Sequence, residues 1–285
     1  MDERQQYRVT ALPEAPAMDS LAIYSGTLAV LQQRANLFFV LVRNIEQANH
    51  NVVFWLNGGP GCSSMTALFL EHGPFRMLSN GRITRNAHSW HKHADVVYID
   101  QPAGVGYSHA QQKVTTTEDA ALHFVAFLDV FMSTFTEYRS SNLYLSGESF
   151  AGTYIAHFAT HMNLLKRYHI HGILLGSPWI SPKHQYGSYI DYAVAHGILS
   201  GKYLQKANTE MVECAAKLSA SPKKALHSAC EKVVTNILDQ SKQNGSFCIN
   251  TFDIRLNDSG DHQGCGMSWP PGVDKLAEYL SVPTI

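Results

Sequence analysis

Charged residues are scarce in this sequence, and neither sign dominates. Asp, Glu, Lys and Arg make up 16% of its 285 residues, against roughly 25% in an average globular domain. The formal net charge is −1, so no overall field attracts nucleic acid or an anionic membrane surface. With 45% apolar residues, the chain is too hydrophobic to be a disordered, self-repelling polymer. We therefore expect a folded protein that does not bind nucleic acid.

Long apolar runs are missing as well. The longest uninterrupted run of aliphatic and aromatic residues is Leu37 to Val42, far short of the roughly 18 residues that a membrane-spanning helix needs. Residues 1–16 contain no stretch typical of a signal peptide. The sequence predicts no membrane span in this chain, which has the character of a mature product or a piece of one.

The five cysteines include no Cys-x-x-Cys pair. Cys62 is isolated, and the other four lie close together: Cys214, Cys230, Cys248 and Cys265. This clustering predicts disulfides in an oxidising compartment rather than zinc ligands, and it leaves Cys62 as the candidate for an unpaired thiol. Two glycosylation sequons, at Asn244 and Asn257, fall in the same region and agree with passage through the secretory pathway.

The central part of the chain alternates short apolar strands with helical patterns. Strands are predicted at Leu37–Val42, Val52–Leu56, Val96–Ile99, Leu143–Leu145 and Ile173–Leu175. Between them, Thr115 and Glu118 have the spacing of a capping box at the start of an apolar helical face. Strands buried on both faces and separated by such helices predict an α/β fold, with an open, mostly parallel sheet and helices on both faces.

The composition changes after the last predicted strand. Lys202 to Lys242 is polar and helical in pattern, and the loop that follows, to Gly266, is rich in Asn, Gly, Ser and Asp. We predict an α/β core over 1–181 and an inserted helical, disulfide-braced cap over 182–266. Residues 267–285 would begin the return to the core, with the sheet incomplete at this end.

The segment Asn142 to Gly152, NLYLSGESFAG, carries the clearest chemical signal. An apolar strand runs into Gly-Glu-Ser-Phe-Ala and then into a helical pattern from Thr153 to Lys166. A nucleophile elbow has this arrangement, because a serine on a strained strand-to-helix turn needs small residues two before and two after it. Gly147 and Ala151 meet that need. We predict Ser149 as a nucleophile whose hydroxyl lies at a helix N-terminus.

A second segment, VVFWLNGGPGCSS at 52–64, ends a predicted strand in a glycine-rich loop. Glycines there let backbone amides approach a ligand closely. In the fold that uses a nucleophile elbow, the loop after an early strand supplies one oxyanion donor and the residue after the serine supplies the other. The predicted donors are the amides of Gly59 and Phe150.

Four motifs resemble those of the serine carboxypeptidases, a branch of the α/β-hydrolase fold. They are WLNGGPGCSS at 55–64, NAHSW at 86–90, DQPAGVGYS at 100–108 and GESFAG at 147–152. The resemblance runs in order from about Leu21 to Ile285. CGMSWPPGVDKLAEYL at 265–280 and LLGSPWISPKHQY at 174–186 are most similar to the fungal pheromone-processing, carboxypeptidase D type.

This resemblance implies that Ser149 accepts the acyl group and that Asn57, Gly58, Glu71 and Glu148 bind the free C-terminal carboxylate of a substrate. Two carboxyl groups can hydrogen-bond an anion only if one of them is protonated, so binding is expected to be favoured at acid pH. The implied substrates are the C-termini of peptides and proteins, including precursors. The implied location is a secretory-pathway lumen, trans-Golgi or vacuole-like, or outside the cell, and a homodimer is left open.

Two positions depart from the family pattern. Ser177 and Pro178 precede Trp179 where typical members carry Asn-Gly, which removes a donor side chain and stiffens a wall of the cleft. Thr66 stands where members specific for basic residues carry an acidic one. We expect Thr66 and Trp179 to line the substrate pocket, without a strong preference for Lys or Arg.

The chain lacks a recognisable partner for its serine. In this fold an aspartate and then a histidine follow the serine on loops after two later strands, and no strand pattern after Leu175 could carry them. Five upstream histidines are expected neither to replace that base nor to bind a metal: His88, His91, His93, His157 and His161. We expect no metal and no cofactor.

In the family the counterpart of Cys62 pairs with a later cysteine, so its isolation agrees with the missing aspartate and histidine. We therefore expect the N-terminal part of a serine carboxypeptidase, or a gene product that has lost the rest. Two alternatives remain open. One is a serine carboxypeptidase-like acyltransferase that uses the same serine, and the other is a non-catalytic protein that binds peptide C-termini or a partner on the same fold.

Overall fold

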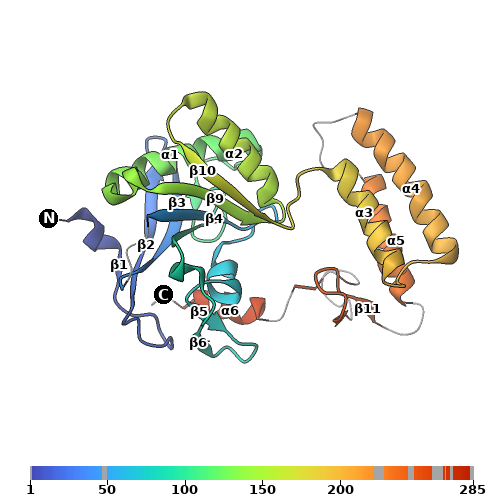
Figure 1. Ribbon diagram of the computed structural model, residues 1–285, viewed down its shortest axis with the longest axis horizontal. Coiled ribbons are helices and arrows are strands. Elements are labelled where there is room, and N and C mark those ends of the chain that lie inside the picture. Colours follow the sequence, from blue (N-terminus) through green and yellow to red (C-terminus); the bar gives the residue numbers. More distant parts are fainter. Residues whose placement is uncertain are drawn as a thin grey trace. The chain divides into compact units, whose positions relative to one another are not determined.

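The structure is a computed structural model that describes residues 2–46, 50–220, 228–242, 247–258, 266, 268–269 and 272–282 (Figure 1). The chain forms two compact units. One consists of Met1–Ile180 and Pro271–Ile285, and the other of Ser181–Pro270. The first unit contains the large sheet, and the second is mainly helical.

The first unit is built on an eight-stranded mixed sheet in the order β1-β2-β3-β7-β4-β9-β10, with β8 paired to β3. Its strands are β1 (Arg8–Val9), β2 (Leu21–Val30), β3 (Ala35–Asn44), β4 (Asn51–Leu56), β7 (Asp95–Ile99), β8 (His109–Ala110), β9 (Asn142–Glu148) and β10 (Ile170–Gly176). Strands β7, β4, β9 and β10 run parallel, whereas β1, β2, β3 and β8 pair antiparallel. The predicted α/β fold is confirmed, and the N-terminal strands make the sheet mixed.

The sheet is covered on both faces, which explains why its central strands are continuously apolar. Helices α1 (Thr117–Thr134) and α2 (Ala151–Leu165) cover one face (Figure 1). The other face packs against a short π-helical turn, η2 (Ala67–Glu71), a small hairpin and α6 (Val273–Leu280). Neighbouring residues of β4 face opposite sides of the sheet: Phe54 packs in the core beneath α1 and α2, and Trp55 packs in the core beneath η2 and the hairpin.

The small hairpin pairs β5 (Phe75–Met77) with β6 (Ile83–Arg85). Short 3₁₀ turns complete the unit: η1 (Glu3–Tyr7), η3 (Trp90–Lys92) and η4 (Thr136–Ser140). Helix α1 begins one residue later than the predicted capping box. Thr116, and not Thr115, accepts a hydrogen bond from the backbone N–H of Asp119 (3.0 Å). The predicted N-cap was wrong by one position, because neighbouring threonines carry the same side chain and either could cap the helix.

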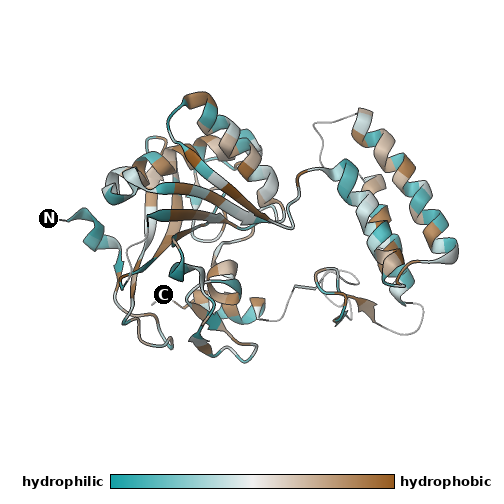
Figure 2. Cartoon of the chain, viewed as in Figure 1, coloured by the Kyte–Doolittle hydropathy of each residue, from teal (hydrophilic) through white to brown (hydrophobic). Residues whose placement is uncertain are grey.

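The described residues of the second unit form three helices: α3 (Pro182–Ala195), α4 (Gly201–Ala220) and α5 (Ser228–Ser241). Each presents apolar residues to a common core and polar ones outward, and Figure 2 shows this alternation along α4. A two-stranded sheet of β11 (Cys248–Ile249) and β12 (Asn257–Asp258) lies in the same unit. Among the described residues, no helix combines the length and hydrophobicity of a membrane span.

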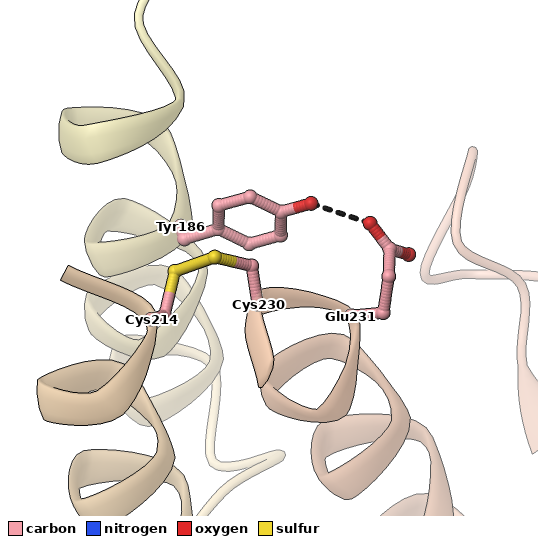
Figure 3. Close-up of a disulfide and its surroundings, with 4 residues drawn as sticks. All are labelled: Tyr186, Cys214, Cys230 and Glu231. Atoms are coloured by element: carbon pink, nitrogen blue, oxygen red, sulfur yellow. Dashed lines mark hydrogen bonds between the residues drawn. A yellow bond between two sulfur atoms is a disulfide. The ribbon is translucent and has the colours of Figure 1, made fainter. Parts of the chain in front are cut away.

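A disulfide between Cys214 and Cys230 links α4 to α5, and the hydroxyl of Tyr186 on α3 donates to Glu231 beside it (Figure 3). Cys248 is disulfide-bonded as well, so the disulfides predicted for this region are confirmed. Cys62 is a free, half-buried thiol, as expected. Cys265 and Asn244 lie outside the described residues.

The core beneath α1 gives a stability prediction. The Phe131 ring is fully buried and contacts the rings of Phe39 and Phe54. Phe131→Ala leaves a cavity that the sheet cannot close, so we expect a loss of about 3–5 kcal/mol in the free energy of unfolding, measured in urea. Leu122→Ala, at a position 45% exposed on the same helix, is the control, expected to change stability by at most about 0.5 kcal/mol. Equal effects would contradict the described packing.

Candidate active site

Ser149 occupies the turn between β9 and α2, with φ at +54°. Few residues with a side chain adopt this left-handed conformation, so neighbouring structure must hold it there. The backbone N–H of Ser149 donates to the carbonyl of Gly176 (3.0 Å), and its carbonyl accepts from the N–H of Trp179 (2.7 Å) and of Gly152 (3.0 Å). The residue is exposed at the start of α2. The turn therefore has the geometry of a nucleophile elbow.

The small residues around this turn are required sterically. A Cβ atom on Gly147 would lie 2.4 Å from the carbonyl oxygen of Leu56 and 2.7 Å from Cβ of Ala151. A Cβ atom on Gly152 would lie 2.6 Å from Cβ of Pro178. Real atoms do not approach so closely, so the sequence pattern that predicted the elbow follows from close packing.

The glycine-rich loop after β4 lies directly against the elbow. Strands β4 and β9 are parallel neighbours with Leu56 paired to Gly147, so their carboxyl ends meet. A Cβ atom on Gly58 would lie 2.6 Å from the backbone nitrogen of Phe150 and 2.9 Å from Cβ of Ser149. The structure thus brings together two predicted segments that lie far apart in sequence. The oxyanion role of the Gly59 and Phe150 amides stays a prediction.

Asn57 connects this loop to two carboxyl groups. Its side chain is buried, and its amide Nδ2 donates to Oε1 of Glu148 (3.0 Å) and more weakly to Oε1 of Glu71 (3.5 Å). The indole N–H of Trp55 donates to Oδ1 of Asn57 (2.7 Å), which fixes the direction in which the amide points. Residues of β4, η2 and β9 are therefore connected through Asn57, in the loop after β4, next to the turn that carries Ser149.

Glu71 and Glu148 are partly buried and close together, and their pKa values are raised mainly by burial. Burial, reinforced by the charge of Glu148, raises the pKa of Glu71 from its ordinary value of 4.5 to about 7. Burial also raises the pKa of Glu148. The pair therefore holds a proton at acid pH and releases it as the pH approaches neutrality. In its protonated form the pair can both accept and donate hydrogen bonds.

Three other predicted residues, Thr66, Trp179 and Asn257, lie in separate segments of the chain. Thr66 is half-buried and immediately precedes η2, the turn that ends at Glu71. The carbonyl of Trp179 accepts from the hydroxyl of Thr153 (2.6 Å), which ties this segment to α2. Asn257 is exposed on β12. Their roles in substrate recognition and glycosylation stay predictions.

No histidine of the described residues forms a hydrogen bond with the hydroxyl of Ser149. His157 and His161 of α2 line a cavity of about 340 Å³ together with Glu118 of α1. Within the same described part of the chain, no three His, Cys, Asp or Glu side chains are grouped as metal ligands.

Trp55 is a part of the site that was not predicted from the sequence. A signal for it exists, because residues two apart on a strand point to the same side, and Trp55 is two positions before Asn57.

The fold and this site define the class. A serine on a strand-to-helix elbow at the carboxyl edge of a mixed α/β sheet is the arrangement of an α/β hydrolase. The model of the serine carboxypeptidase family matches residues 13–285, and the chain belongs to that family.

Curated relatives and a solved structure agree with this assignment. The pheromone-processing carboxypeptidase KEX1 of Arthroderma otae is 37% identical over 98% of this chain and 46% of its own length. The kex1 protein of Aspergillus terreus is 35% identical over 98% of this chain and 47% of its own. The chain thus spans about half the length of these relatives. The crystal structure of a Saccharomyces cerevisiae prohormone-processing carboxypeptidase matches 98% of this chain and 67% of its own, with a TM-score of 0.83 and 27% identity.

The carboxyl pair makes stability depend on pH. Because the folded state raises the pKa of Glu71 to about 7 from 4.5, its contribution is present below pH 4.5 and is lost as the pH rises through 7. Glu71→Gln removes this titration, so we expect the free energy of unfolding to fall less between these pH values than in the wild type. Chemical denaturation across the range measures it. Glu278→Gln, exposed on α6, should keep the wild-type slope, and identical slopes for all three proteins would contradict the raised pKa.

Proposed function

We propose that this chain supplies the nucleophile and the terminal-carboxylate site of a serine-type carboxypeptidase, which releases C-terminal amino acids through an acyl-enzyme on Ser149. One observation carries the proposal. The strained, exposed Ser149 turn lies against Gly58, and the adjacent Asn57 donates to a carboxyl group on the residue before the serine.

The proposed chemistry follows from these positions. The Ser149 hydroxyl attacks the carbonyl carbon of the last peptide bond and gives its proton to a general base. The amides of Gly59 and Phe150 donate hydrogen bonds to the oxyanion that forms. The C–N bond then breaks, the free amino acid leaves with a proton from the base, and water hydrolyses the acyl-serine ester.

The carboxyl pair supports an exopeptidase rather than an endopeptidase. A peptide's terminal carboxylate can accept hydrogen bonds from Asn57 and from a protonated member of the Glu71–Glu148 pair. An internal peptide bond brings no such anion to the site. A general esterase would have no use for two carboxyl groups beside its nucleophile.

The substrate class is proposed from the relatives and from two side chains of this chain. The relatives are named for processing pheromones and a prohormone, and we propose peptide precursors as substrates here. Thr66 places no negative charge at its position, and Trp179 adds an apolar wall. Strong selection for C-terminal Lys or Arg is therefore not expected.

We place the protein in the lumen of the secretory pathway, in a trans-Golgi or vacuole-like compartment. The disulfides at Cys214–Cys230 and at Cys248 support an oxidising environment. The exposed Asn257 sequon is compatible with glycosylation there.

The carboxylate site predicts how peptides bind. An N-acylated dipeptide acid should bind the 285-residue Ser149→Ala variant at least about tenfold more tightly than the matching dipeptide amide at acid pH. This preference should disappear as the pH rises above 7, because the carboxyl pair then loses its proton. Isothermal titration calorimetry at both pH values measures it. Equal affinities for the acid and the amide at acid pH would refute the terminal-carboxylate site.

No histidine of the described residues forms a hydrogen bond with the Ser149 hydroxyl, which predicts little turnover. We expect the isolated 285-residue chain, as a fragment or an inactive form, to release almost no C-terminal residue from a peptide, with product followed by mass spectrometry. Robust release that Ser149→Ala abolishes would show that the chain carries its own base. An ester formed from an activated acyl donor and an alcohol would instead indicate an acyltransferase.

A further inference from the structure

We propose that Asp100 is a positioning residue, whose buried carboxylate holds the 57–64 loop in the geometry that binds a terminal carboxylate. This inference rests on the function proposed above. Asp100 directly follows β7, forty-three positions after Asn57 in the sequence, and its side chain is fully buried.

The Asp100 carboxylate receives hydrogen bonds from two loops. Its Oδ1 accepts from the hydroxyl of Ser63 (2.6 Å) and from the backbone N–H of Ser64 (3.0 Å). Its Oδ2 accepts from the backbone N–H of Tyr107 (3.1 Å). Each oxygen therefore acts as an acceptor, and one side chain ties the end of the 57–64 loop to the 104–108 loop.

Ser64, whose backbone N–H donates to Asp100, is in turn hydrogen-bonded to Asn57. The hydroxyl of Ser64 donates to the carbonyl of Ile99 (2.6 Å) and accepts from the backbone N–H of Asn57 (3.1 Å). Thus the backbone of Asn57 depends on Ser64, while its side chain is oriented by Trp55. If Ser64 moves, both the Asn57 amide and the following Gly58 move relative to Ser149.

The second loop is shaped around the same carboxylate. A Cβ atom on Gly106, where φ is +54°, would lie 1.9 Å from Oδ2 of Asp100. Only glycine lets the chain pass this close and still aim the N–H of Tyr107 at the oxygen. The hydroxyl of Ser108 closes the loop by donating to the carbonyl of Asp100 (2.6 Å) and accepting from the N–H of Phe38 (2.7 Å).

Hydroxyl and amide groups, rather than cations, satisfy this carboxylate among the described residues. Burial raises the pKa of Asp100, and the hydrogen bonds from Ser63, Ser64 and Tyr107 oppose that rise. An asparagine at this position could accept on one side only, because its NH₂ group would face a donor on the other. The site therefore needs two acceptor oxygens, and Asp100→Asn is a conservative way to remove one.

The test measures discrimination between a dipeptide acid and its amide, in the 285-residue chain carrying Ser149→Ala. Asp100→Asn should reduce the acid-over-amide preference about tenfold, as expected for a small displacement of binding groups. Ser63→Ala, which removes one of the three hydrogen bonds, should reduce it less. Amide binding should stay unchanged in both.

A second readout separates positioning from loss of structure. The hydrogen bond from Asn57 lowers the pKa of Glu71, so loosening Asn57 should move the pH at which acid binding is lost to a higher value. The matched control is Asp129→Asn on α1, which replaces a carboxylate that also accepts from two side chains, Arg167 and Tyr168. It should leave both readouts at wild-type values.

The outcomes are distinct. Folded Asp100→Asn and Ser63→Ala variants with wild-type discrimination and pH dependence would overturn the proposal. So would an equal loss of acid and amide binding, which a merely structural role predicts. If Asp100→Asn does not fold, the milder Ser63→Ala variant decides. A wild-type site without acid preference would instead overturn the proposed function, and the role of Asp100 with it.

Discussion

The contact between the backbone of Gly58 and the turn at Ser149 is the constraint on which the site depends. It exists because β4 and β9 are parallel neighbours in which Leu56 pairs with Gly147, so the loop after one strand and the elbow after the other share the same edge of the sheet. No side chain fits between them. This close packing places a backbone rich in N–H donors beside the serine and, at Asn57, an amide beside Glu148.

Electrostatics then follow from this packing. Burial raises the pKa of both Glu71 and Glu148, the charge of Glu148 raises that of Glu71 further, and Asn57 donates to both carboxyl groups. Such a pair binds an anion well only while it retains a proton, which couples the proposed recognition of peptide C-termini to the acidity of the compartment. At the opposite end of the same loop, the buried carboxylate of Asp100 accepts three hydrogen bonds, and we propose that these hold the loop in place.

Local steric patterns in the sequence were enough to predict the elbow and the glycine-rich loop. Gly147 precedes the serine because a Cβ atom there would collide with Leu56 and Ala151, and this need is visible in the sequence. The contribution of Asp100 could not be predicted, because its hydrogen bonds to Ser63 and Ser64 depend on which strands are neighbours and how the loops close, whereas the i, i+2 spacing of Trp55 and Asn57 is visible in the sequence. Likewise, the short strand β1 and the pairing of β2 with β3 were missed, because antiparallel register is set by partners distant from the local pattern.

The most direct test of the central claim is a crystal structure of the 285-residue Ser149→Ala chain with a bound dipeptide acid at acid pH. We expect the terminal carboxylate to lie within hydrogen-bonding distance of the Asn57 amide and the Glu71–Glu148 pair, with the scissile carbonyl carbon facing residue 149. A dipeptide bound with its carboxylate away from these groups, or with its amino end in their place, would contradict it.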